Sequence, residues 1–487
     1  MPNESIESGN AGKSGNSSKS DNSNKSNNAS KNSQSKKTGK KSGRKSDSGP
    51  RQIRHLLNRA GFGFTPEELA PYLEMGYNSA LKQLTTPSSV DNGALDRMLA
   101  EQNFDFTNPD DIKRWWLFRM MFTGRPLEEK MTLFWHGHFA TSDNKVRSPY
   151  AMYVQNCTMR KHAFGKFDDL LLAMSKDPAM INWLDNQQNR KNKPNENYAR
   201  EVMELFTVGI GNYSEQDVKE GARAFTGWQT KPDGFFFNKG QHDAGSKTFL
   251  GQTGDFNGED IVTILANEKA TGHYLACKLI RYFALYEPSN SFVEEIASVY
   301  KKSDHNIGAM VSGIFSSRYF TTSACFHSLI KSPCEYVVGM LKTFQVSQVD
   351  AEVPRLMAAM GQNLFNPPSV KGWDGGENWI ASDVMMERFN FATRMISQKF
   401  DYLDKYSSPA KIATEQGLTD AGETVDYFLS LLVEDDAPAS VRERLVKYVS
   451  TDLSGKPLDK LPGDKVLDAR LRGLVHLIMT LPTYQLT

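Results

Sequence analysis

Residues 195–209 read NENYAREVMELFTVG and have the periodicity of an amphipathic α-helix. With about 100° of rotation per residue, the apolar side chains fall within one arc of roughly 160°, and the polar side chains gather on the opposite side. The apolar set comprises Tyr198, Ala199, Val202, Met203, Leu205, Phe206 and Gly209, and the polar set comprises Glu196, Asn197, Arg200, Glu201, Glu204 and Thr207. The stretch therefore predicts a helix that packs one face against other elements.

Helical signals of the same kind run from about Arg51 to the end of the chain. Thr65 is an expected N-cap, because Pro66 follows in the first helical position and Glu68 lies three residues after the cap. Strand signals are confined mainly to residues 235–251, FFFNKGQHDAGSKTFLG, where apolar pieces flank turn residues in the manner of a short hairpin. We predict a mainly α fold, a large multi-helix globular body with at most a short β-hairpin.

The chain divides by composition into a polar tail and a globular body. Its 487 residues are too many for one ordinary core, and 39% of them are hydrophobic. Residues 1–50 consist almost wholly of Ser, Asn, Lys and Gly and carry a charge of +6, which leaves −5 for the rest. We expect a disordered basic tail over residues 1–50. A main α-helical body follows over residues 51–405, with a C-terminal helical segment, residues 406–487, packed on it.

The tail and the rest of the chain also exclude several classes of protein. The tail has no aromatic residues on which bases could stack, so it predicts a solubilising or tethering role and no specific nucleic-acid binding. No apolar run is long enough for a membrane span, and no signal peptide is visible, which favours a cytoplasmic protein with export as the alternative. The four cysteines are widely spaced and form no zinc motif.

The polar face of residues 195–209 allows two interpretations. On an exposed face, Arg200 simply forms i, i+4 ion pairs with Glu196 and Glu204. If other helices cover that face, Asn197, Glu201 and Glu204 project two carboxylates and an amide into a shared space. Such a set holds a divalent metal or separates the pKa values of two carboxyl groups. Burial decides between the two interpretations.

Three other stretches carry residue types that chemistry needs. In FWHGHFATS, His136 and His138 point about 200° apart on a helix, so only one of them faces any given pocket. In QHDAGSKTFLG, a base, an acid and a cation surround a glycine on a predicted loop, namely His242, Asp243 and Lys247. In NPPSVKGWDGGENWI, the loop tryptophans Trp373 and Trp379 either cap a cleft or fill the core.

These stretches together resemble one bacterial family. HLLNRAGFG, FWHGHFATS, NENYAREVMELFTVG, DVKEGARAFTGW, HDAGSKTFLG and NPPSVKGW, in this order, are similar to the family catalogued as domain of unknown function 1800. The resemblance implies a mostly helical protein without an assigned activity. Members of this family are often encoded beside a second family, whose fold resembles sulfatases and alkaline phosphatases. The resemblance therefore also implies a protein partner with such a fold. Many members of the family are exported.

Two functions fit the residues. The first is an enzyme, a metal-assisted hydrolase or transferase for a polar or anionic substrate, whose cleft is lined by the 195–209 helix. Its candidate catalytic residues are Asn197, Arg200, Glu201, Glu204, His138, His242, Asp243 and Lys247, with a divalent metal as the candidate cofactor. The second is a non-catalytic binding or assembly protein that uses the same helix and the Trp373 loop as a docking surface.

Overall fold

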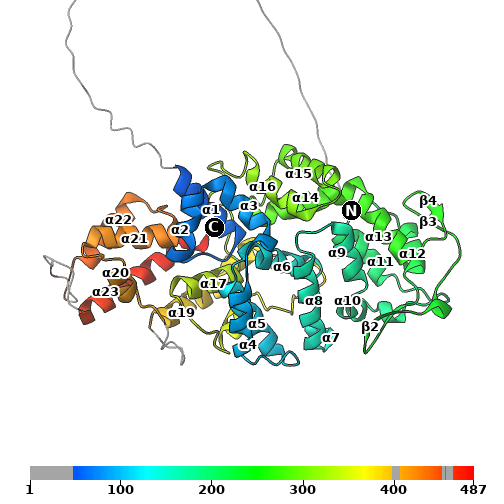
Figure 1. The fold of residues 1–487 in the computed structure, drawn as a ribbon, viewed down its shortest axis with the longest axis horizontal. Helices are drawn as coiled ribbons and strands as arrows, with labels where there is room; N and C mark the ends of the chain where they lie inside the picture. Colours follow the sequence, from blue (N-terminus) through cyan, green and yellow to red (C-terminus); the bar gives the residue numbers. More distant parts are fainter. Residues whose placement is uncertain (1–47, 398–405, 452–453, 455, 457–463) are drawn as a thin grey trace, which may run out of the picture. The chain divides into compact units, whose positions relative to one another are not determined.

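Helices dominate the computed structural model, which describes residues 48–397, 406–451, 454, 456 and 464–487. The described part contains 23 α-helices, so the predicted mainly α fold is confirmed (Figure 1). The predicted capping box is present, because the Thr65 side chain accepts from the Glu68 N–H and the Glu68 side chain accepts from the Thr65 N–H. The predicted tail lies, as far as residue 47, outside the described residues.

In the residues that the structure describes, the strands form two small antiparallel hairpins, where the sequence predicted at most one. β1 (Trp228–Lys231) pairs with β2 (Gly234–Phe237), and β3 (Lys247–Phe249) pairs with β4 (Gln252–Gly254). The two apolar pieces of residues 235–251 therefore do not pair with each other. Each has a nearer partner across a two-residue turn, and in the second turn Leu250 and Gly251 both have positive φ, as a tight hairpin turn requires.

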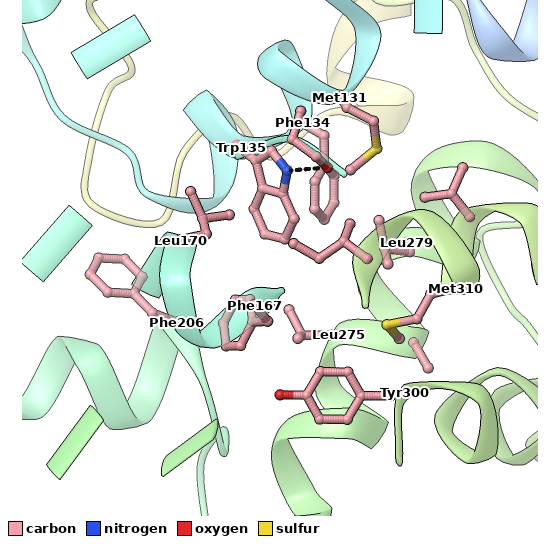
Figure 2. Close-up of a cluster of buried hydrophobic side chains, with 14 of the residues drawn as sticks. Met131, Phe134, Trp135, Phe167, Leu170, Phe206, Leu275, Leu279, Tyr300 and Met310 are labelled. Carbon is pink, nitrogen blue, oxygen red and sulfur yellow. Dashed lines mark hydrogen bonds between the residues drawn. The ribbon is translucent and has the colours of Figure 1, made fainter. Parts of the chain in front are cut away.

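A first group of helices surrounds one hydrophobic cluster. It consists of α1 (Ser48–Ala60), α2 (Pro66–Met75), α3 (Tyr77–Thr85), α6 (Pro126–His138), α9 (Phe167–Ser175), α11 (Asn197–Glu201), α12 (Glu215–Ala224), α13 (Gly258–Asn267), α14 (Lys269–Phe283), α15 (Asn290–Lys302) and α16 (Ile307–Ser316). Figure 2 shows Phe134 and Trp135 of α6 in this cluster with Phe167 of α9 and Leu275 of α14.

A second cluster is built mainly by later helices. It involves α4 (Gly93–Glu101), α5 (Pro109–Phe122), α17 (Pro333–Thr343), α18 (Val353–Ala359), α19 (Ser382–Ile396), α20 (Pro409–Glu415), α21 (Ala421–Val433), α22 (Ala439–Val449) and α23 (Asp464–Met479). Residues Asp47–Thr487 form one compact unit. The division predicted near residue 406 stays a prediction, and residues 398–405 beside it are outside the described part.

Three helices contribute side chains to both clusters, namely α6, α8 (Pro149–Lys161) and α10 (Pro178–Trp183). The remaining helix, α7 (Asp143–Val146), is one short turn before α8. Among the three, α6 is buried on nearly all sides, including its polar residues Glu129, Lys130, His136 and His138. A helix in that position needs an internal partner for every polar side chain, because water does not reach them.

Glu129 shows how such a partner is supplied. Its carboxylate is fully buried and accepts from Trp116 Nε1 at 3.0 Å, from Arg119 Nε at 2.9 Å and from Arg160 Nε at 2.7 Å. Burial alone would raise the pKa of Glu129, but the charges and hydrogen bonds of Arg160 and Arg119 outweigh burial and bring the pKa to about 2. This cluster joins α6 to α5 and α8.

We expect Glu129→Gln to lower the free energy of unfolding by about 3–5 kcal/mol at pH 7, because it leaves two guanidinium groups in the interior without their counter-ion. The pKa of Glu129 falls from 4.5 to about 2 on folding, so its contribution is complete above pH 4.5 and is lost as the pH falls toward 2. Urea unfolding at pH 7 and pH 3 measures both effects.

The matched control is Asp426→Asn, which breaks the solvent-exposed Arg442–Asp426 pair. Solvent screens that pair, so the control should change the free energy of unfolding much less than Glu129→Gln does. Equal losses in the two variants, or a Glu129→Gln loss that is as large at pH 3 as at pH 7, would contradict the assignment.

Candidate functional site

The apolar face predicted for residues 195–209 is largely buried, but the segment is not one regular helix. α11 ends at Glu201 and continues as a π-helical turn, Val202–Phe206. π-Helical turns interrupt the regular hydrogen-bond ladder and occur frequently at functional sites. Here two carbonyl groups at the end of the turn accept from other elements. His138 Nε2 of α6 donates to Phe206 O at 3.0 Å, and the Tyr274 hydroxyl of α14 donates to Leu205 O at 2.9 Å.

The polar face of the segment is partly exposed and paired with near neighbours. Arg200 donates to both carboxylate oxygens of Glu215 at 2.7 and 2.8 Å, and it lies 3.4 Å from Glu196. Asn197 is exposed and lies 3.4 Å from Asp185 Oδ2. The predicted ion pair of Arg200 with Glu196 is present, but Arg200 lies closer to Glu215 of α12 than to Glu196.

The two predicted carboxylates of this helix are half-buried. Glu204 accepts from the Tyr213 hydroxyl at 2.7 Å. Burial and the charge of Glu204 raise the pKa of Glu201, against the opposing charges of Arg200 and Lys371. Within the described residues, no three His, Cys, Asp or Glu side chains are grouped closely enough to hold a metal ion. The geometry therefore gives the candidate metal no ligand set there.

The side chains of the His242 loop are fixed by internal partners. His242 Nδ1 donates to Thr226 O at 2.9 Å, and Asp243 accepts from Arg223 Nε at 2.7 Å. Lys247 is buried, and its Nζ donates to the carbonyl oxygens of Asp243 and Gly245 at 2.7 and 2.8 Å. The bonds of His242 and Asp243 fasten the loop between the hairpins to the C-terminal end of α12, and the bonds of Lys247 hold the loop together internally.

The two predicted groups of polar residues therefore attach to opposite ends of α12. Arg200 is bonded to Glu215 at its start, and Asp243 is bonded to Arg223 near its end. Eight residues at a rise of 1.5 Å per residue separate these two positions by about 12 Å. In the described part of the chain, no hydrogen bond or ion pair connects the two groups directly.

The two histidines of α6 point to different surroundings, as the helical spacing predicts. His136 Nε2 accepts from the Phe365 N–H at 3.1 Å, and burial lowers its pKa to about 3. His138 lines a cleft on the other side. Burial first, and then the charge of Lys278, holds the pKa of His138 well below its ordinary value. Both imidazoles are therefore neutral at pH 7.

The cleft beside His138 has a volume of about 320 Å³, which is within the range for small-molecule sites. Phe134, Gly137 and His138 of α6 line one wall, and Lys278, Arg281 and Tyr282 of α14 line another. Each set has the spacing i, i+3, i+4, which places its members on one helix face. The other walls come from three segments, which supply Tyr286, Leu329, Ile330, Ser332, Glu335, Gln362, Lys371, Trp373, Asp374 and Trp379.

A close backbone contact holds the tryptophan loop against α6. Gly372 has φ +84°, and a Cβ atom at this position would lie 2.4 Å from the carbonyl oxygen of Gly137. The contact places Trp373 beside α6, with its ring 5.5 Å from that of His136. The glycines of WHGH and KGW are therefore parts of one contact, and Trp373 forms part of the cleft wall.

The charge of the cleft is mainly positive. Arg281 and Lys371 lie exposed at its edge, and Lys278 is half-buried inside it. Of its carboxylates, Asp374 is exposed, while Glu335 is paired with Lys130 of α6. Burial lowers the pKa of Lys278 to about 8. The contact that the structure gives its ammonium group is with the Tyr274 ring at 5.4 Å, and no hydrogen bond or ion pair to Lys278 is present in the described residues.

Lys278 and Arg281 were not among the residues selected from the sequence. They lie in HYLACKLIRYF, which reads as an ordinary half-buried helix. The sequence feature that could have indicated the site is the spacing of Lys278, Arg281 and Tyr282, which places them on one face of a helix. Long cationic side chains on such faces usually extend to solvent, so that signal does not single out a site.

A family model described as "Protein of unknown function (DUF1800)" matches residues 55–486, nearly the whole chain. The searches found no curated protein and no solved structure that matches the chain. No helix in the described part of the chain is long and apolar enough to cross a membrane.

Gly372→Ala tests the contact that builds the cleft wall. The φ of +84° costs a non-glycine residue about 1–2 kcal/mol, and the clash with Gly137 O adds an overpacking cost of about 1–3 kcal/mol. Gly211→Ala is the matched control, because Gly211 has φ +89° and open space around its Cβ position. In thermal unfolding we expect Gly372→Ala to be the less stable variant. Equal melting temperatures would show that the loop is not held by this contact.

Proposed function

Because the chain belongs to the DUF1800 family, whose function is unknown, we propose a function from the cleft itself: it binds an anionic small molecule that carries a flat ring. The observation that carries this proposal is the half-buried Lys278, which lines the cavity and has no ion-pair partner in the described residues. A buried charge without a partner is costly, so a bound anion would stabilise this arrangement.

The walls of the cleft favour a ring. Phe134, Tyr282, Tyr286, Trp373 and Trp379 all line it. Aromatic faces pack against sugar rings and aromatic rings. They also exclude water, and an ion pair between Lys278 and a bound anion is stronger where water is excluded. A ring that carries a carboxylate, sulfate or phosphate group combines the two features that this lining would recognise.

The size of the cleft favours a small ligand over a docked protein. A volume of about 320 Å³ corresponds to a ligand of modest size, whereas stable protein interfaces are broad and far less concave. Arg281 and Lys371 at the edge would attract an anion, and Lys278 would bind it inside. The 195–209 segment supports the site from behind, through the bonds of His138 and Tyr274 to its π-helical turn.

Paired probes test this function. We expect naphthalene-2-sulfonate to bind in a fluorescence titration, and 2-naphthol, which has the same ring and no charge, to bind more weakly. Lys278→Met should weaken the sulfonate by about tenfold or more, since a hydrogen bond to a charged group contributes about 1.5–3 kcal/mol. It should leave 2-naphthol nearly unchanged.

Lys269→Met is the matched control, because Lys269 is exposed at the start of α14 and does not line the cleft. Trp373→Ala should weaken both probes, because it removes a wall that does not depend on charge. Equal affinity for the sulfonate and 2-naphthol, or a Lys278→Met affinity equal to that of the control, would refute the proposal.

A further inference from the structure

Lysines with a lowered pKa occur at three places in the described residues, and their surroundings differ. Lys247 donates to two backbone carbonyl oxygens, which hold its ammonium group. Lys331 lies over the Tyr484 ring at 4.2 Å and lines a cavity of only about 40 Å³, about the size of one water molecule. Lys278 lines the cleft of about 320 Å³, which accommodates an organic ligand, and it has no hydrogen-bond or ion-pair partner in the described residues.

The surroundings of Lys278 keep its amine available. Glu335, the half-buried carboxylate of the cleft, is held by Lys130 and by the Ser332 N–H, which donates to it at 2.6 Å. His138 also lines the cleft, but its imidazole is not an anion and so is no ion-pair partner for Lys278. The charge of Lys278 instead helps to lower the pKa of His138. An ammonium group without a carboxylate partner, in apolar surroundings, loses its proton more readily than an exposed lysine does.

We propose that Lys278 is a covalent amine site for an anionic aldehyde or ketone bound in this cleft. The inference rests on the proposed function, since the anionic group would bring the carbonyl group to the amine. A desolvated lysine in an apolar pocket is an activated nucleophile toward carbonyl compounds. A ligand without a carbonyl group places its anion on the Lys278 ammonium group. In a ligand that also carries a carbonyl group, Arg281 and Lys371 at the edge would hold the anion, and the neutral amine of Lys278 would react with the carbonyl group.

The reaction balances without an oxidant, a reductant or a metal. The neutral amine nitrogen of Lys278 adds to the carbonyl carbon and forms a carbon–nitrogen bond. The carbonyl oxygen then leaves as water with the two hydrogens of the amine, and an imine remains. Because only the neutral amine attacks, the rate of the first step should rise with pH around the pKa of about 8, well below the range for exposed lysines.

The test uses the full chain and 4-formylbenzenesulfonate, an anionic aromatic aldehyde, at a concentration below that of the protein. Borohydride reduces an imine to a stable secondary amine, and peptide mapping by mass spectrometry then locates it. We expect Lys278 to be modified at least tenfold more than exposed Lys269 and Lys371. Naphthalene-2-sulfonate should compete with this labelling, and neutral benzaldehyde should label without preference.

Lys278→Arg tests bond formation at this position. It keeps a positive charge in the cleft but has no amine that forms an imine, so its total labelling should fall well below that of the parent. Lys269→Arg is the matched control and should label as the parent does. Each variant is compared with the parent by its melting temperature, which shows whether it is folded.

The outcomes distinguish the two proposals. Sulfonate binding with labelling spread evenly over exposed lysines, or with unchanged total labelling in Lys278→Arg, overturns the covalent site and leaves the binding function standing. If naphthalene-2-sulfonate does not bind the parent protein, both proposals fall. Selective labelling of Lys278 that naphthalene-2-sulfonate suppresses supports both.

Discussion

The fold depends on the burial of a helix that carries charged side chains. α6 packs against both hydrophobic clusters, yet it contains buried acidic, basic and imidazole groups. Each is bonded to a different part of the chain: Glu129 to α5 and α8, Lys130 to Glu335 of α17, His136 to the Phe365 N–H, and His138 to Phe206 O. Rotation of α6 would leave these groups in the interior without partners, at a cost of several kcal/mol for each charged one. The bonds therefore set the rotation of α6 and the positions of the segments around it.

The same rotation produces the cleft. Once His136 is turned toward Phe365, His138 must lie on another side of the helix, because two residues along a helix differ by about 200°. Phe134 and Gly137 lie on the cleft side with His138. Gly137 then admits the backbone of Gly372, which brings Trp373 to the wall. The packing of α6 and the shape of the candidate site are thus consequences of one arrangement.

The electrostatics of the cleft depend on which nearby carboxylates are paired with other side chains or lie outside its lining. Glu335 could have paired with a cation in the cleft, but it is the partner of Lys130. Glu201 and Glu204 belong to the segment behind His138 and do not line the cleft. Lys278 lies beside the Tyr274 ring, lines the cavity and has no ion-pair partner in the described residues. The Lys130–Glu335 pair accounts for one of the two carboxylates that line the cleft.

Local patterns in the sequence were enough to predict the capping box at Thr65, the buried apolar face of residues 195–209 and the divergence of His136 and His138, because each is set by periodicity and by residues close in the chain. The family also followed from motifs taken in order. Which polar side chains line a cavity could be seen only once the helices were packed together. Lys278 and Trp373 are 95 positions apart, and the chemistry proposed for Lys278 depends on which groups pack around it, which no local pattern records. Burial and charge pairing are properties of the assembled neighbours, so only the packed helices could distinguish a solvated lysine from one that faces a binding site.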